Sequence, residues 1–298
     1  MRLRLYIVLL LLPAYLSAGN MYEVGIRAGM ANWNAQTEYV QAQPGIHAGI
    51  EAAYTWLAPH FAGIRIGLTV DRHACAFGKT GYTDSYQTID VENQTMQVDY
   101  TIGRLHEEYS VWSAGIPVQI VFNWDNLRLC AGPKAVFPLS PCRWYEKAED
   151  AQLSVYYPDY DNRVYEAYPL AASRHFEEYQ EGTKQLPVVQ WWLAAEMTYT
   201  IPLVTSAKHY GGLSIGVYFD YCFSNLAHSH SDAVSLLMLS DTRDGFPLHR
   251  IMTPVIESNR QGEPLVNNCS MYDAGIKIAW TITPFNPHNN SRYGCKCL

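Results

Sequence analysis

The stretch that decides the fold is Tyr22-Glu23-Val24-Gly25-Ile26-Arg27-Ala28-Gly29-Met30, which alternates strictly between two kinds of side chain. Its even-numbered residues are apolar, and its odd-numbered residues are glycine or charged. Successive side chains of a β-strand point to opposite faces, so this segment has one apolar face and one face of small and charged groups. Charged groups that share their face with glycines are typical of a strand that separates lipid from a narrow polar lumen.

The same alternation returns in seven further segments, so we expect eight strands. The additional strands are expected near residues 45–56, 62–71, 109–122, 127–137, 189–201, 212–223 and 272–282. Short turns join some of them, whereas long segments join the others, and short and long connections alternate along the chain. The long loops are expected at 31–44, 72–108, 139–187 and 225–269.

This pattern predicts an all-β fold: an eight-stranded antiparallel up-and-down transmembrane β-barrel with long extracellular loops and periplasmic turns. A helical membrane protein is excluded, because no segment after the leader approaches 18 uncharged apolar residues. A barrel of eight strands has an interior that side chains just fill, so we expect no wide aqueous channel.

The first residues have the features of an export signal. Met1-Arg2-Leu3-Arg4 is basic, the run from Leu5 to Leu12 is apolar, and small residues follow at Ser17 and Ala18. We expect cleavage near Ala18, and hence a signal peptide over 1–18, a barrel domain over 19–285 and a periplasmic C-terminal tail over 286–298. The expected location is the bacterial outer membrane.

Charge sets limits on partners. The net charge of -7 argues against a nucleic-acid partner, which would favour a basic surface. The charged residues on the inward faces are five acids and five bases, and we expect them to form a self-neutralising ion-pair network in the lumen. An active-site carboxylate pair is the alternative, but charged lumens are ordinary in such barrels. The residues concerned are Glu23, Arg27, Glu51, Arg65, Arg128, Lys134, Glu196, Asp220, Asp273 and Lys277.

The sequence contains no strong catalytic, metal or cofactor motif. No His-Glu-x-x-His motif occurs and no Ser-His-Asp order can be singled out, so we expect no enzyme and no cofactor. The segment His228-Ser229-His230-Ser231-Asp232 offers too few ligands for a metal site, which needs three or four. Cys75, Cys142 and Cys269 fall near the bases of three long loops, which leaves one loop-stapling disulfide open.

The third long loop is the best candidate for a binding surface, because its tyrosines are interleaved with acidic residues. Tyrosine supplies a large contact area at low entropic cost, as in recognition loops. The alternative is that this loop only caps the barrel. The tyrosines concerned are Tyr145, Tyr156, Tyr157, Tyr160, Tyr165 and Tyr168.

From Tyr22 to Ile282 the chain resembles the outer-membrane β-barrel families of Bacteroidota, the PorT-like group, whose architecture is similar to the OmpA and OmpX barrels. The resemblance rests on four motifs: Val24-Gly25-Ile26-Arg27-Ala28-Gly29, Pro44-Gly45-Ile46-His47-Ala48-Gly49, Ile116-Pro117-Val118 and Leu127-Arg128-Leu129-Cys130-Ala131-Gly132-Pro133-Lys134. It implies a barrel and no particular activity.

The function expected from these observations is a non-enzymatic structural or surface-binding role through the extracellular loops. The expected partners are outer-membrane lipid and a protein or glycan at the loops, and the chain is expected to be a monomer. One alternative is a small-solute pore or a component of an envelope transport or secretion machine. A further alternative is an outer-membrane enzyme.

Overall fold

The computed structural model describes residues 19–57, 62–90, 93–164, 175–205, 209–227, 234–240 and 249–284. The expected leader, the tail after residue 285 and the His228–Asp232 segment lie outside these residues. The described chain is mostly strand, with one short 3-10 helix, η1 (Pro158–Tyr160). No helix in this part of the chain is long and apolar enough to cross a membrane.

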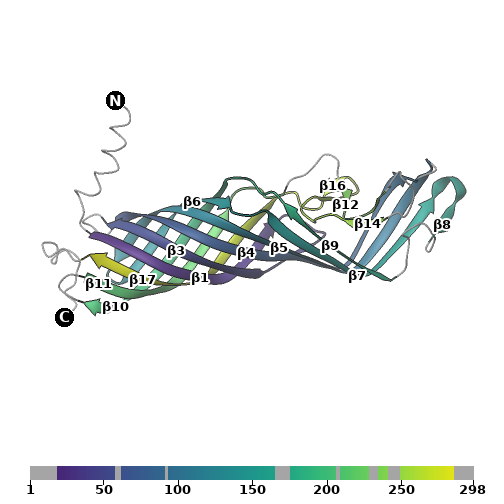
Figure 1. Cartoon of the computed structure of the whole chain (residues 1–298). Helices are drawn as coiled ribbons and strands as arrows, with labels where there is room; N and C mark the ends of the chain where they lie inside the picture. Colours follow the sequence, from purple (N-terminus) through teal and green to yellow (C-terminus); the bar gives the residue numbers. More distant parts are fainter. Residues whose placement is uncertain are drawn as a thin grey trace, which may run out of the picture.

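Eight long strands close into an antiparallel ring (Figure 1). Each strand pairs with its two neighbours in the order β1, β3, β4, β5, β6, β10, β11, β17, and β17 pairs back with β1. The predicted eight-stranded antiparallel barrel is therefore confirmed. The strands are β1 (Gly19–Ala35), β3 (Gly45–Leu57), β4 (Ala62–Ile89), β5 (Thr95–Trp124), β6 (Leu127–Pro138), β10 (Gln190–Thr205), β11 (His209–Cys222) and β17 (Cys269–Pro284).

The outer wall of the barrel is an apolar belt. Val24 is 67% exposed and Ile50 is 60% exposed, whereas Glu23 and Glu51, which alternate with them, are 2% and 4% exposed. Only a surrounding of hydrocarbon makes such an exterior favourable, and a closed barrel leaves no unpaired backbone group in it. The fold is thus a transmembrane β-barrel.

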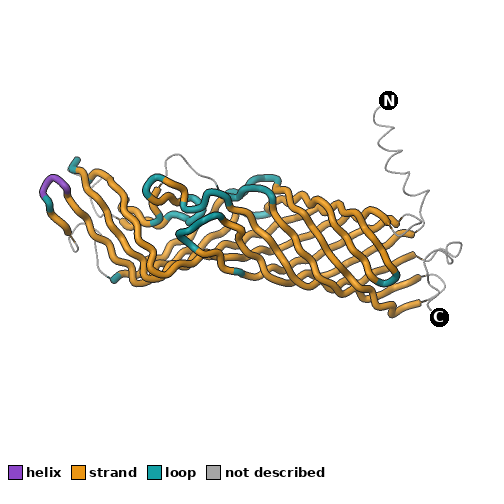
Figure 2. The backbone as a smooth tube through the Cα atoms, turned by 180° about the vertical axis from the view of Figure 1, so that it is seen from behind, coloured by secondary structure: helices purple, strands orange, loops and turns teal. Residues whose placement is uncertain are grey.

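Two of the barrel strands continue far beyond the belt, and this corrects the expected loop over 72–108. β4 and β5 stay paired from Ala62↔Phe122 to Ile89↔Thr95, so this region is a long hairpin rather than a loop. Figure 2 shows from behind that these strands run without a break from the barrel into the projecting part. Backbone hydrogen bonds to a neighbouring strand explain why the segment is regular: apart from two short interruptions, each strand provides the other with a ladder of partners.

The other three expected loops also contain strands. In the first, β2 (Gln41–Gln43) pairs with β4. In the third, β7 (Cys142–Tyr157) pairs with β5, and both β8 (Asn162–Val164) and β9 (Phe176–Lys184) pair with β7. The fourth holds β12 (Val234–Ser235), β13 (Leu237–Ser240), β14 (His249–Met252), β15 (Ser258–Arg260) and β16 (Glu263–Pro264). We call residues 76–108, 142–184 and 234–266, where described, the lobe.

A transverse crease crosses the sheet of the lobe. Gly81, Gly103 and Asp150 lie opposite one another in the registers of β4, β5 and β7, at a level where the pairing is interrupted. Gly81 and Asp150 have positive φ values of 69° and 51°, a region that glycine and aspartate tolerate. On each strand the buried residues switch between odd and even numbers at this level. The crease thus bends the sheet while one face stays buried throughout.

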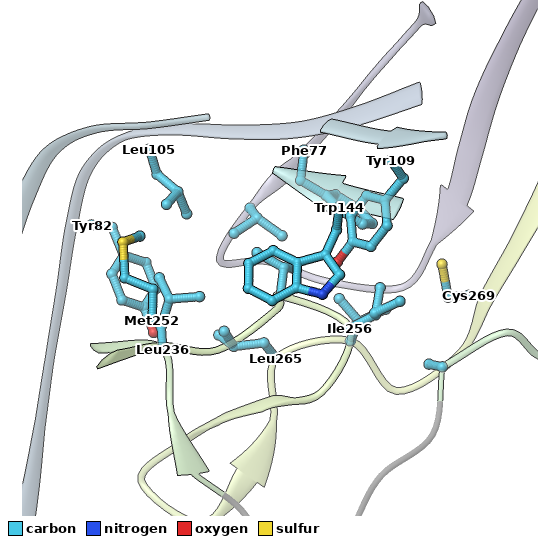
Figure 3. Packing of buried hydrophobic residues seen from close by; sticks show 14 of the residues in the cluster. Phe77, Tyr82, Leu105, Tyr109, Trp144, Leu236, Met252, Ile256, Leu265 and Cys269 are labelled. Carbon is cyan, nitrogen blue, oxygen red and sulfur yellow. The ribbon is translucent and has the colours of Figure 1, made fainter. Parts of the chain in front are cut away.

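The buried face of the lobe has a hydrophobic core, which continues into the loop end of the barrel at residues such as Trp33 and Trp192. Figure 3 shows residues from the sheet, such as Phe77, Leu105 and Trp144, facing Met252 and Ile256 of the fourth long connection. Hydrogen bonds hold the fourth long connection against the sheet. Leu239 N–H donates to Tyr86 Oη at 2.8 Å, and Met252 N–H donates to the Gln180 side chain at 2.8 Å. The lobe is therefore a packed unit at the loop end of the barrel.

Candidate functional site

The lumen contains two layers of charge. In the layer nearer the short turns, Arg65 contacts Glu23 at 3.0 Å and Glu196 at 2.7 Å, and it also contacts Glu51. Lys277 contacts the same three carboxylates, with 2.7 Å to Glu196 and 2.8 Å to Glu51. Arg128 completes the layer through Glu23. Three bases thus meet three acids.

In the layer nearer the lobe, the ion pairs have different members. Arg27 Nη2 lies 2.7 Å from Asp220, and the Arg27 guanidinium covers the ring of Tyr218 at 4.0 Å. Lys134 Nζ lies 2.9 Å from both Asp220 and Asp71. Asp71 is therefore a sixth acid of the network that the sequence reasoning left out, although its inward position follows from the alternation.

Asp273 departs from the expected pairing. Its ion-pair partners are two histidines rather than an arginine or a lysine. His73 Nδ1 lies 2.9 Å from Asp273 Oδ2, and His47 Nε2 lies 3.9 Å from the same oxygen. The expected balance of five acids and five bases is therefore wrong. Among the described residues, the lumen has six acids and five bases, which leaves one surplus negative charge when both histidines are neutral.

The described lumen is filled rather than open. None of the ten predicted network residues is more than 7% exposed, and Arg65, Arg128, Lys134 and Lys277 are among the largest fully buried side chains. Burial of this many charges is favourable only with close partners, because an unpaired buried charge costs several kcal/mol. The interior thus holds the wall together and leaves little room for solutes.

His73 was missed because the third strand was expected to end at Asp71. The inward series Arg65, Thr69, Asp71 continues by the same period of two to His73, so the alternation itself carried the signal. His47 was placed on the inward face but given no role. The contact between His73 and Asp273 could not be predicted from the sequence, because Asp273 lies some 200 residues away in β17.

Ser113 also lies beside His73. Its Oγ is 2.8 Å from His73 Nε2, so Ser113, His73 and Asp273 are in contact in the order of a hydrolase triad. Ser113 is 3% exposed, opposite Asp71 in the barrel wall. A nucleophile needs a substrate carbonyl beside it, and a buried side chain in a filled lumen does not offer that access.

The predicted binding tyrosines occupy different places in the lobe. Tyr145 is 39% exposed on the outer face of β7, and Tyr160 is 64% exposed on η1. Tyr156 lies under the Arg163 guanidinium at 5.4 Å, whereas Tyr157 packs partly against the lobe core. Tyr165 and Tyr168 lie outside the described residues. The four described tyrosines therefore differ in exposure and in surroundings.

The outer face of the creased sheet is hollowed beyond the crease. The concavity has a volume of about 420 Å³ and is polar. Arg163 Nη1 crosses it to Asp99 at 2.5 Å and to Ser154 at 3.0 Å. Its lining residues are Thr83, Asp84, Ser85, Asp99, Tyr100, Thr101, Gln152, Leu153, Ser154, Arg163, Arg260 and Gln261.

The described cysteines form no disulfide. Cys75, Cys130, Cys142, Cys222 and Cys269 are buried free thiols. The loop-stapling disulfide left open by the sequence is thus not present, and hydrogen bonds and apolar contacts hold the lobe instead. Cys295 and Cys297 lie outside the described residues.

No family model matches the chain, and no curated protein does. Among solved structures it is similar to Ail, the attachment invasion locus protein of Yersinia pestis, in complex with the heparin analogue sucrose octasulfate: 7% identity, TM-score 0.27, covering 88% of this chain and 98% of that one. Neisserial surface protein A matches at 10% identity and TM-score 0.27, covering 89% and 97%. Outer membrane protein OprG of Pseudomonas aeruginosa matches at 8% identity and TM-score 0.26, covering 91% and 98%.

These structural neighbours are outer-membrane β-barrels of Gram-negative bacteria. At such identities and TM-scores they carry no argument about this chain, and its fold rests on the closed ring of strands. Membership of the PorT-like group stays a prediction.

Proposed function

We propose that the chain is a monomeric outer-membrane β-barrel protein that uses its lobe to bind a protein or a glycan at the cell surface, without enzymatic activity. The apolar belt supports residence in a membrane, and strand barrels span outer membranes in bacteria. The expected leader over 1–18 belongs to the same proposal, since export is needed to reach that membrane.

One observation carries the binding role: the polar concavity on the outer face of the lobe. Asp99, Gln152 and Arg163 present a carboxylate, an amide and a guanidinium to the same hollow, and the ring of Tyr156 lies beside Arg163. A few convergent polar groups beside an aromatic ring, on a rigid sheet, are typical of sites that fix a polar ligand. The filled lumen supports a role at the surface over a role as a pore.

Location and orientation are tested by cysteine labelling in intact cells. We expect a membrane-impermeant maleimide to label Tyr179→Cys, whose side chain is 71% exposed on β9 of the lobe. The matched control is Asp125→Cys, in the turn between β5 and β6, which should stay unlabelled until the cells are broken. A soluble, heat-insensitive protein or labelling of Asp125→Cys would contradict the proposal.

Binding is tested with the full-length protein in detergent on an array of glycans and on immobilised cell-surface proteins. We expect retention of a subset of probes that is lost in the Asp99→Ala and Arg163→Ala variants. Arg104→Ala, which removes an exposed guanidinium from the proximal half of the sheet, serves as the control and should bind normally. Conductance in planar bilayers, or equal binding by all variants, would overturn the proposal.

A further inference from the structure

Four metal-ligating side chains meet in the upper lumen, apart from the lobe. His47 comes from β3, Asp71 and His73 from β4, and Asp273 from β17. His47 and His73 are directly opposite in the register of β3 and β4. All four residues are at most 3% exposed.

The atoms that face one another in this cluster make no well-directed hydrogen bond, although two pairs of them lie at ion-pair distance. They are His47 Nε2, His73 Nδ1, Asp71 Oδ1 and both carboxylate oxygens of Asp273. Orphaned buried polar atoms are rare, and each one costs free energy unless something satisfies it. Lys134 and Arg27 do not remove the deficit, because Lys134 is bonded to the other oxygen of Asp71, and Arg27 lies 3.7 Å from Oδ1.

The spacing of these atoms fits a small cation. His73 Nδ1 is 2.9 Å from Asp273 Oδ2, His47 Nε2 is 3.3 Å from Asp71 Oδ1, and His47 Nε2 is 3.9 Å from Asp273 Oδ2. A tetrahedral zinc ion with bonds of about 2.0–2.1 Å holds neighbouring ligand atoms roughly 3.4 Å apart. The ligand atoms of His47, His73 and Asp273, which all lie within 4.8 Å of one another, therefore need only small side-chain adjustments to enclose one ion, whereas the Asp71 carboxylate has to swing further in.

The second nitrogen of each imidazole is already held. His47 Nδ1 lies 2.5 Å from Tyr218 Oη, and His73 Nε2 lies 2.8 Å from Ser113 Oγ. Histidines that ligate metals nearly always have such an outer partner, which fixes the tautomer and the orientation of the ring. The surplus negative charge of the lumen also lies at this cluster and favours a cation.

We propose that His47, His73 and Asp273, with Asp71 as the fourth ligand, bind one transition-metal dication of the zinc type inside the barrel. Two imidazoles and two carboxylates are a donor set suited to zinc. The ion satisfies the orphaned atoms and ties β3, β4 and β17 together. The hydrolase relay from Ser113 is the weaker explanation, because it uses only His73 and Asp273 and does not account for the approach of His47 Nε2 to both Asp71 and Asp273.

The test uses the full-length protein, stripped with EDTA, refolded in detergent and dialysed against Zn²⁺. We expect one zinc per chain in the parent and a higher unfolding temperature with zinc than without. Replacement by Co²⁺ should give the visible absorption of a tetrahedral site, a readout that needs no variant. Absence of stoichiometric zinc, or of the cobalt spectrum, in the folded parent would overturn the proposal.

Variants locate the ion. His47→Gln and His73→Gln should lose the bound zinc, whereas His106→Gln, an exposed histidine of the lobe, and the double variant His228→Gln/His230→Gln should retain it. The heat-modifiable gel shift reports whether each variant folds. If the lumen variants do not fold, Ser113→Ala gives the answer: loss of the ring-orienting contact should weaken zinc binding about 10- to 100-fold. Unchanged zinc affinity in Ser113→Ala together with loss of ester hydrolysis would favour the relay and overturn the metal site.

Discussion

Glu107 on β5 and Glu146 on β7 lie directly opposite each other in the sheet of the lobe, and neither side chain reaches solvent. Both are outside the membrane-spanning belt. Burial raises the pKa of Glu107 to about 8, and burial together with the neighbouring Glu107 carboxylate raises the pKa of Glu146 well above its usual range. Val255 N–H donates to Glu107 Oε2 at 2.8 Å, so this pair lies under the covering segment of the lobe.

The lobe should loosen as pH rises. The folded-state pKa of Glu107 is raised above its unfolded value, so at pH values between these two pKa values the folded lobe binds more protons than the unfolded chain. The free energy of unfolding therefore falls with rising pH in this range, by about 1.4 kcal/mol per pH unit for one group. We expect proteolysis of segment 249–257 to accelerate as the pH rises toward about 8 and to level off above that pH. Glu146→Gln should flatten this dependence, because one buried carboxylate is removed. An equally steep profile in the variant would contradict the assignment.

Removal of one lumen base should destabilise the barrel strongly. Arg65→Met leaves the carboxylates around it short of one buried partner, which costs about 3–5 kcal/mol. The matched control is Arg104→Met, whose side chain is 73% exposed beside Glu149, and which should change stability by about 0.5 kcal/mol or less. The measurement is the urea midpoint in lipid vesicles, followed by tryptophan fluorescence.

A side chain at Gly29 should prevent closure between β1 and β17. A Cβ there would collide with backbone atoms of Ala274 and Gly275, neither of which can move away without breaking the ladder. We expect Gly29→Val to lose the heat-modifiable gel shift. Ala28→Val adds bulk one residue earlier on the lipid-facing side and should fold normally. Normal folding of both variants would show that the wall is looser than the structure indicates.

A charged side chain on the apolar belt should lower the free energy of unfolding only if the belt contacts lipid. Ile26 is 57% exposed and lies between Ile50 and Ile278 in the registers of its two neighbours. Ile26→Arg should lower stability in vesicles by about 2–4 kcal/mol. Tyr179→Arg, on the exposed face of the lobe, should have little effect. Equal stability of Ile26→Arg and the parent would contradict the membrane assignment.

The long hairpin shows where sequence reasoning stopped short. Alternation identified the strands near Ile64 and Trp112, because lipid outside and glycines or charges inside give a clear pattern. Beyond the belt, the buried residues of β4 include Tyr82 and Asp84, so the contrast between faces weakens. The reversal of the pattern at Gly81 and Gly103 also breaks the period. The segment 72–108 was therefore expected to be a loop.

The amino-acid sequence by itself determined which side chains of the barrel face lipid and which face the lumen, because that choice depends only on the period of two along each strand. The tertiary structure alone decided which partners meet across the lumen. Arg65 meets Glu196 and His73 meets Asp273 only after the ring has closed. The tertiary structure also decided that the fourth connection covers the lobe. An apolar strand face has the same sequence pattern whether lipid or a distant segment of the chain covers it.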